Sequence, residues 1–209
     1  MADTRTFGTM VSRIARELRR DNLTADIKDS IVDAIRYYEN ERFSFLETAS
    51  VVTTTASDPY LSSLPAGLLS LDKVELDNGG SRYPVDPKTY DWITDIDTGN
   101  SNGPPYDYAL YKGNMRLYPV PDQAYSIHLS YQVQLTEISA SATSTATNSW
   151  VTKAEPMIRC RAKGLVFANR LRNMKDAQAM EYMAEQEHDK LKAKDTGLVT
   201  TGRITKTAF

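Results

Sequence analysis

The spacing of apolar residues changes twice along the chain, and this change constrains the fold more than any other feature. Between residues 7 and 38, apolar side chains recur every three or four positions, as on one face of a helix. Between residues 48 and 133, β-branched runs and apolar/polar alternation favour strands. The helical spacing returns between residues 153 and 196. The sequence therefore predicts helices at both ends and strands between them.

The N-terminal segment is predicted to form two amphipathic helices. The first apolar face consists of Phe7, Met10, Val11, Ile14 and Leu18. The second consists of Ile27, Ile31, Ala34, Ile35 and Tyr38. Asp21-Asn22 breaks the pattern, and we expect Thr24 to be the N-cap of the second helix. The short break indicates an antiparallel pair.

The middle of the chain is predicted to form two hairpins. Asn78-Gly79 follows the alternating run 69–76 and suits a type I′ turn, because both central residues of that turn need positive φ. Gly113-Asn114 makes the second turn, and residues 125–133 alternate again. We expect both hairpins to form one small sheet, with a short helix between residues 86 and 96.

The C-terminal third is predicted to hold a loop, two helices and an arm. Residues 139–150 are polar and of low complexity, as in flexible loops. Thr152 to Glu155 matches a capping box for the third helix. We expect Asp176 to cap a fourth helix and Gly197 to stop it. Residues 197–209, which are rich in β-branched side chains, would then form an extended arm.

These elements together predict an α+β fold. Neither helix pair has enough partners alone to bury its apolar stripes, so we expect the pairs to pack as an antiparallel four-helix unit with an inserted small antiparallel β-domain. The expected boundaries are 1–46 for the N-terminal helix pair, 47–138 for the β-domain, 139–150 for the loop, 151–196 for the C-terminal helix pair and 197–209 for the extended C-terminal arm.

The small net charge of −2 hides a segregation of charge. Residues 58–122 contain ten acidic and five basic side chains, whereas residues 153–196 contain ten basic and seven acidic ones. Residues 1–20 contain five arginines and two acids. Such asymmetry bears on partners and association rather than on the fold.

Several function classes have no support in the sequence. No apolar run approaches the roughly 20 residues that span a membrane, and the N-terminus lacks the apolar core of a signal peptide. We therefore expect no membrane partner and synthesis in a cytoplasm. One cysteine, Cys160, and two distant histidines, His128 and His188, do not have zinc-site spacing. We expect no catalytic residue, no metal and no cofactor.

Four aspartates in the acidic middle could be read in two ways; they are Asp86, Asp91, Asp95 and Asp97. Paired carboxylates cleave glycosidic bonds when one of them has a raised pKa. These four lie in a polar, proline-flanked stretch with nothing evident to desolvate one of them. A solvated acidic face is therefore favoured over a glycosidase pair.

The order of the parts resembles a known family. A helix pair ends in the stretch Tyr37 to Glu47, and a strand block follows. Next come the hairpin phrase Tyr111 to Asp122 and the strand Tyr125 to Tyr131, before a second helix pair and a tail. The chain resembles the head-to-tail adaptor proteins (connector or tail-accessory proteins) of tailed bacteriophages, especially short-tailed ones. The resemblance covers nearly the whole chain and rests on architecture and loose phrases rather than on an invariant motif.

The resemblance implies a structural role at the head–tail junction of a virion that is assembled in the host bacterial cytoplasm. It implies a homo-oligomeric ring, typically of twelve copies, that binds the portal protein and a tail or nozzle protein. Double-stranded DNA would pass through the lumen without sequence recognition. The arm would reach the portal, so the candidate interface residues are Leu198, Val199, Arg203, Ile204, Lys206 and Phe209. An acidic face would not hold phosphates, so the candidate lumen-facing residues are Asp86, Asp91, Asp95 and Asp97.

Three alternatives stay open. Some similar proteins are credited with cleaving peptidoglycan, so one alternative is a phage-associated glycosidase that uses paired carboxylates. Another is a subunit elsewhere in the tail, such as a completion protein. The arginines of the first helix leave a DNA-binding module as the third.

Overall fold

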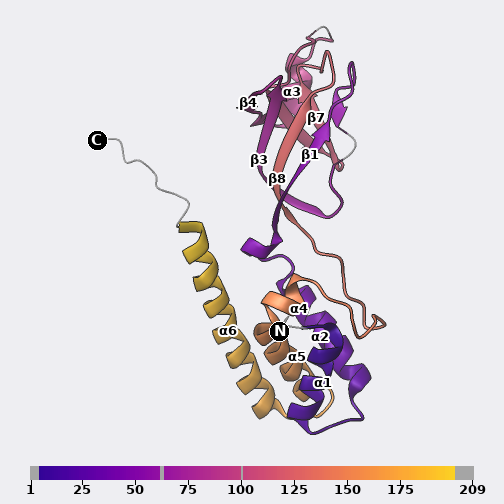
Figure 1. The fold of residues 1–209 in the computed structure, drawn as a ribbon, viewed down its shortest axis with the longest axis vertical. Coiled ribbons are helices and arrows are strands. Elements are labelled where there is room, and N and C mark those ends of the chain that lie inside the picture. Colours follow the sequence, from indigo (N-terminus) through magenta and orange to yellow (C-terminus); the bar gives the residue numbers. More distant parts are fainter. Residues whose placement is uncertain (1–4, 62–63, 100, 201–209) are drawn as a thin grey trace, which may run out of the picture. The chain divides into compact units, whose positions relative to one another are not determined.

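The chain divides into two compact units, which we describe separately. The structure is a computed structural model that describes residues 5–61, 64–99 and 101–200, with side chains only as far as Thr196 (Figure 1). The helical unit comprises residues 1–46 and 135–209, and the β unit comprises residues 47–134. The β unit is thus inserted in the sequence between two halves of the helical unit.

The helical unit is built around α5. The described elements of this unit are α1 (Phe7–Leu18), α2 (Thr24–Tyr38), the 3-10 helix η1 (Ser44–Leu46), α4 (Ser149–Lys153), α5 (Glu155–Asn169) and α6 (Met174–Thr200). Helix α5 contacts α1, α2, α4 and α6 (Figure 1). Its apolar residues cover most of its circumference, and Met157, Ile158 and Val166 are buried in the shared core. Both halves of the chain therefore contribute to one core.

The predicted apolar stripes of α1 and α2 face this core. Phe7, Ile14, Ile27 and Ile31 are all buried. Helix α6 differs, because its buried positions are small or polar, as at Ala177, Ala184 and Asp195. The apolar spacing predicts that α6 turns Ala177, Met180, Met183, Ala184 and Leu191 inward. Leu191 packs against the core, whereas Met183 is exposed. The predicted inward face of α6 is therefore confirmed at Ala177, Ala184 and Leu191 and wrong at Met183.

Three predicted helix starts are wrong. Thr24 is the first residue of α2, and the buried Leu23 occupies the N-cap position. Thr152 lies within α4, whose cap is Asn148, and α5 follows directly after Ala154 without a side-chain cap. At the start of α6, Asn173 rather than Asp176 accepts the capping bond, from the Asp176 N–H. At α2 the buried Leu23 takes the N-cap position without a side-chain bond, whereas at α4 and α6 asparagines supply caps, which contribute about 1 kcal/mol each.

Helix α6 continues through Gly197 to Thr200, so the predicted stop at Gly197 is wrong. A glycine within a helix costs about 1 kcal/mol, which does not by itself end a helix. The first four residues of the expected extended arm are accordingly helical. Residues 201–209 lie outside the described residues.

The low-complexity loop is bound to the start of α1. The backbone N–H of Phe7 donates to the carbonyl of Ala146 at 2.8 Å, and that of Gly8 donates to Ser144 at 2.9 Å. A Cβ at Gly8 would lie 2.6 Å from the Cβ of Ser144, so the close approach requires glycine. The loop therefore satisfies N–H groups that the first turn of a helix leaves free.

The β unit contains two four-stranded sheets. The first has the order β1-β8-β3-β4, with β1 (Glu47–Thr53), β8 (Ser126–Val133), β3 (Leu68–Asn78) and β4 (Ser81–Pro84). The second has the order β2-β7-β6-β5, with β2 (Tyr60–Leu61), β7 (Asn114–Tyr118), β6 (Asp107–Tyr111) and β5 (Asp86–Pro87). All pairs are antiparallel except β5 with β6.

The two predicted hairpins exist but lie in different sheets, so the prediction of one sheet is wrong. Hairpin β3–β4 pairs with β8, and hairpin β6–β7 pairs with β2. Leu76 and Ile127 from one sheet share a core with Met115 and Leu117 from the other. Two sheets allow the apolar side chains of both hairpins to be covered. The predicted short helix is present as α3 (Tyr90–Ile96).

Candidate functional site: a basic groove on the helical unit

The predicted interface residues fall at or beyond the end of α6. Leu198 and Val199 belong to its last turn, and their side chains lie outside the described residues. Arg203, Ile204, Lys206 and Phe209 lie wholly outside the described residues.

The four candidate lumen-facing aspartates do not share one environment. Asp86, Asp91 and Asp95 are exposed. The Asp97 side chain is 9% exposed, and its Oδ2 atom lies 2.8 Å from the Nη2 atom of Arg116. Asp97 is therefore held in an ion pair, whereas the other three remain accessible to solvent.

Asp107 is a buried acid that the sequence analysis missed. It lies opposite Asp86 in the β5–β6 register, 3.7 Å from the ammonium group of Lys88. Burial raises the pKa of Asp107, and the attraction of Lys88 opposes this shift. Its position on a strand that alternates apolar and polar residues gave no signal of burial.

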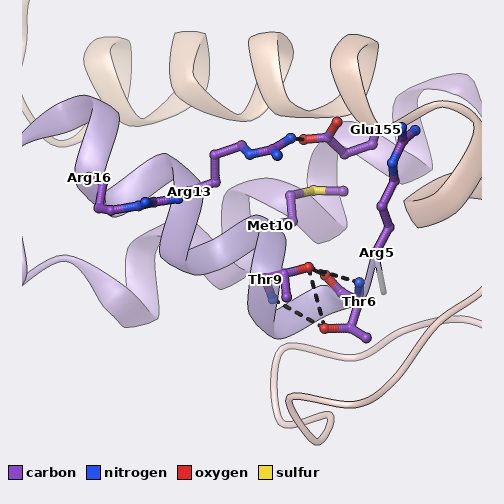
Figure 2. Close-up of a pocket in the computed structure, with 7 residues that line it drawn as sticks. All are labelled: Arg5, Thr6, Thr9, Met10, Arg13, Arg16 and Glu155. Carbon is purple, nitrogen blue, oxygen red and sulfur yellow. Dashed lines mark hydrogen bonds and ion pairs between the residues drawn. The ribbon is translucent and has the colours of Figure 1, made fainter. Parts of the chain in front are cut away.

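A cleft of about 290 Å³ lies beside the N-terminal half of α1 (Figure 2). Its lining comprises Arg5, Thr6, Thr9, Met10, Arg13, Arg16 and Glu155. Thr6 and Thr9 form a reciprocal capping box, in which the Thr9 N–H donates to Thr6 Oγ1 at 3.2 Å and the Thr6 N–H donates to Thr9 Oγ1 at 2.9 Å. This cap fixes the start of α1 and so the positions from which the arginines project.

Glu155, the acidic residue that lines this cleft, already forms ion pairs within the unit. Glu155 is 5% exposed, and its Oε1 atom lies 2.9 Å from Arg13 and 3.1 Å from Arg159. Arg159 also pairs with Glu17, whose second oxygen lies 2.8 Å from Lys163. Burial raises the pKa of Glu17, but the hydrogen bonds and charges of Lys163 and Arg159 outweigh it, and the net pKa is lowered.

Two further clefts lie beside the C-terminal half of α6. One holds about 320 Å³ and is lined by Arg5, Ser44, Phe45, Thr152, Lys153, Leu191, Lys194 and Asp195. The other holds about 250 Å³ and is lined by Lys153, Ala154, Pro156, Met157, Glu187, Lys190, Leu191 and Lys194. Arg5 is common to the first and second clefts, and Lys153, Leu191 and Lys194 are common to the second and third. We call the three clefts together the basic groove.

Positive charge dominates the basic groove. Its cations are Arg5, Arg13, Arg16, Lys153, Lys190 and Lys194, and its acids are Glu155, Glu187 and Asp195. Each acid is engaged within the unit: Glu187 lies 2.6 Å from Lys190, and Asp195 accepts hydrogen bonds from Ser44. Arg16, Lys153 and Lys194 form no ion pair with any residue that the structure describes. The groove can therefore attract a negatively charged ligand.

The C-terminal half of α6, which forms one wall of the groove, is held by polar contacts. Asp195 accepts from the N–H and the hydroxyl of Ser44 at 2.8 and 2.6 Å. The Lys192 ammonium donates to the Arg42 carbonyl at 2.7 Å. His188 Nε2 lies 2.7 Å from a carboxylate oxygen of Glu41. These contacts fix α6 against residues 41–44.

The sequence showed the two groups of basic residues that line the groove, but it did not show that they lie on one surface. The arginine-rich start and the basic stretch 153–196 are both visible in the sequence, and more than 130 residues separate them. Only the packing of α1 and α6 on α5 brings them to one surface.

The described part of the chain offers neither a metal site nor a membrane-spanning helix. Within 5–61, 64–99 and 101–200, no group of three or more His, Cys, Asp or Glu side chains could hold a metal ion. None of the helices in these ranges has the length and apolar character to cross a membrane.

Comparison with known proteins identifies the family. The model of the SU10 adaptor protein family matches residues 5–202, which include every helix and strand from α1 to α6. A search of curated proteins finds no significant match. Because the family match spans nearly the whole chain, the protein belongs to the SU10 adaptor protein family, a family of phage head-to-tail adaptors, as its resemblance predicted.

Proposed function

We propose that the protein is a structural subunit of a ring beneath the phage portal, which joins the DNA-filled head to the tail and lets DNA pass through its lumen. The family match over residues 5–202 is the observation that carries this proposal. The proposed partners are the portal protein, a tail or nozzle protein and further copies of the chain, typically twelve in the ring.

The distribution of charge between the two units supports distinct partners. The helical unit contains 20 basic and 16 acidic residues, whereas the β unit contains 5 basic and 11 acidic ones. Surfaces of opposite charge attract different partners and disfavour wrong ones. An acidic surface also repels DNA phosphates, so we propose that Asp86, Asp91 and Asp95 line the lumen.

The C-terminal residues are the proposed portal contact. Residues 201–209 include Arg203, Ile204, Lys206 and Phe209 and no acid. Such a segment binds a neighbouring protein through main-chain hydrogen bonds and apolar pockets, with its basic side chains directed at an acidic receptor. Leu198 and Val199 would extend this contact from the last turn of α6.

Assembly with the portal tests the proposal directly. The full chain, a variant without residues 201–209 and a variant without residues 197–209 are mixed with purified portal and examined by electron microscopy and mass measurement. We expect rings on the portal with the full chain, and folded proteins that do not join the portal with both deletions. Normal assembly of the deletion variants would contradict the role of the arm.

The same images test the proposed lumen. Density that places Asp86, Asp91 and Asp95 away from the channel would contradict their assignment. Failure of the full chain to join any portal would contradict the adaptor function itself.

The alternative function is a peptidoglycan glycosidase with paired carboxylates, and Asp107, whose pKa is raised, is the residue in the β unit that favours it. We propose instead that the chain has no catalytic activity. A cleared band on a peptidoglycan zymogram that disappears in the Asp107→Asn variant would decide for the enzyme.

A further inference from the structure

We propose that the basic groove binds an extended, acidic segment of a partner protein whose apolar side chains enter the floor of the groove. This proposal rests on the adaptor function, because it gives the helical unit a second contact with a partner, separate from the C-terminal arm.

The charges of the groove select an anionic ligand. Six cations line it, and its three acids already have partners inside the unit. Lys153 and Lys194 are exposed and form no ion pair with a described residue, and both lie where the second and third clefts meet. A carboxylate there would gain attraction without displacing an existing partner.

The apolar part of the lining favours a peptide over a nucleic acid. Pro156, Met157 and Leu191 line the third cleft together with its lysines. A DNA backbone contacts cations and gains nothing from such a floor, whereas a peptide with alternating side chains uses both. Single-stranded nucleic acid also needs exposed aromatic rings for stacking. Phe45, the aromatic residue that lines the groove, is only 9% exposed and is stacked on Phe43.

The tail of the chain itself does not fit the groove. Residues 197–209 contain Arg203 and Lys206 and no acid, so their charge has the same sign as the groove. Like charges disfavour this pairing both within one copy and between copies. The arm and the groove would instead favour the same kind of acidic receptor.

The walls of the groove are held before a ligand arrives. The ion pair of Glu155 with Arg13 joins α1 to α5, and the bonds between Asp195 and Ser44 fix α6. A site whose walls are already ordered loses less entropy on binding. This favours a ligand that is itself flexible and becomes ordered in the groove.

Titration of the full-length, ¹⁵N-labelled chain with a ten-residue peptide of alternating glutamate and leucine tests the proposal. We expect saturable shifts of the amide signals of Lys153, Leu191 and Lys194, and none with the matching peptide of alternating lysine and leucine. The double variant Lys153→Glu/Lys194→Glu removes two attractions and adds two repulsions, so it should weaken binding about tenfold.

A matched control separates the groove from the overall charge. The double variant Arg20→Glu/Lys175→Glu changes the net charge equally at exposed positions outside the groove, and we expect it to change the affinity less than about twofold. Equal weakening in both double variants, or shifts that lie elsewhere, would overturn the proposal. So would tighter binding of a twelve-base-pair DNA duplex at the same amides.

A second copy of the chain is the remaining occupant, and sedimentation tests it. Self-association that the Lys153→Glu/Lys194→Glu variant abolishes would show that another copy fills the groove and would overturn the proposal. If the chain still assembles on portals but does not bind the peptide, only the proposed role of the groove is overturned. If the chain binds the peptide but does not assemble on portals, the proposed role of the groove stands and the adaptor function is overturned.

Discussion

Replacing Phe43 by alanine should destabilise the helical unit severely, because this ring joins the chain after α2 to α4 and α6. Phe43 is 1% exposed, and its ring lies 5.1 Å from that of Phe45 and 5.5 Å from that of Trp150. The Lys192 ammonium lies 4.1 Å from its centre. Phe→Ala substitutions in cores cost about 3–5 kcal/mol. Since single domains have free energies of unfolding of about 5–15 kcal/mol, the loss is a large fraction of the total.

The two tryptophans allow this loss to be measured in the correct unit. Trp150 is 2% exposed in the helical unit, whereas Trp92 is 40% exposed in the β unit. In a Trp92→Phe background, the fluorescence of Trp150 alone follows urea denaturation of the helical unit. We expect the free energy of unfolding to fall by at least about 3 kcal/mol in the Phe43→Ala variant.

The control is an aromatic residue of the same unit that lies on the surface. Tyr182 on α6 is 62% exposed, so Tyr182→Ala should change the free energy of unfolding by no more than about 0.5 kcal/mol. A loss below about 1 kcal/mol for Phe43→Ala, or equal losses for both variants, would refute the reasoning that this ring joins the elements of the unit.

Two further predictions concern titratable groups of the helical unit. Burial raises the pKa of Glu41, but hydrogen bonds from His188 and Lys192 outweigh it and the net pKa is lowered. The contribution of Glu41 to stability is therefore complete above about pH 4.3 and is lost as the pH falls through the lowered pKa. The Glu41→Gln variant should lose less stability than the wild type as the pH falls in this range. An equal loss of stability in both proteins would contradict this prediction. Burial raises the pKa of the Cys160 thiol, which is 4% exposed, so a disulfide reagent should react with it only as the unit unfolds in urea, and rapid reaction in native buffer would contradict its burial.

Local patterns in the sequence determined the type of most elements. The apolar stripe that begins at Phe7 predicted α1 because residues three and four apart share one face of a helix, and that face is buried. Asn78-Gly79 predicted a tight turn after β3, and a turn is present, but its central residues are Gly79 and Gly80, with φ +65° and +101°, because Asn78 still pairs with Ser81 in the strands. The acidic middle and the basic ends were also visible without the fold.

Only the tertiary structure decided where elements end and what meets at a surface. The buried Leu23 takes the cap position expected for Thr24, and Thr152 lies inside a helix that Asn148 caps. Apolar/polar alternation predicts that one face of a strand is buried, but it does not predict which sheet the strand joins. The sequence therefore did not predict that the two hairpins lie in two sheets. The basic groove joins side chains from α1 and α6, and a contact between residues so distant in sequence depends on how both helices pack on α5.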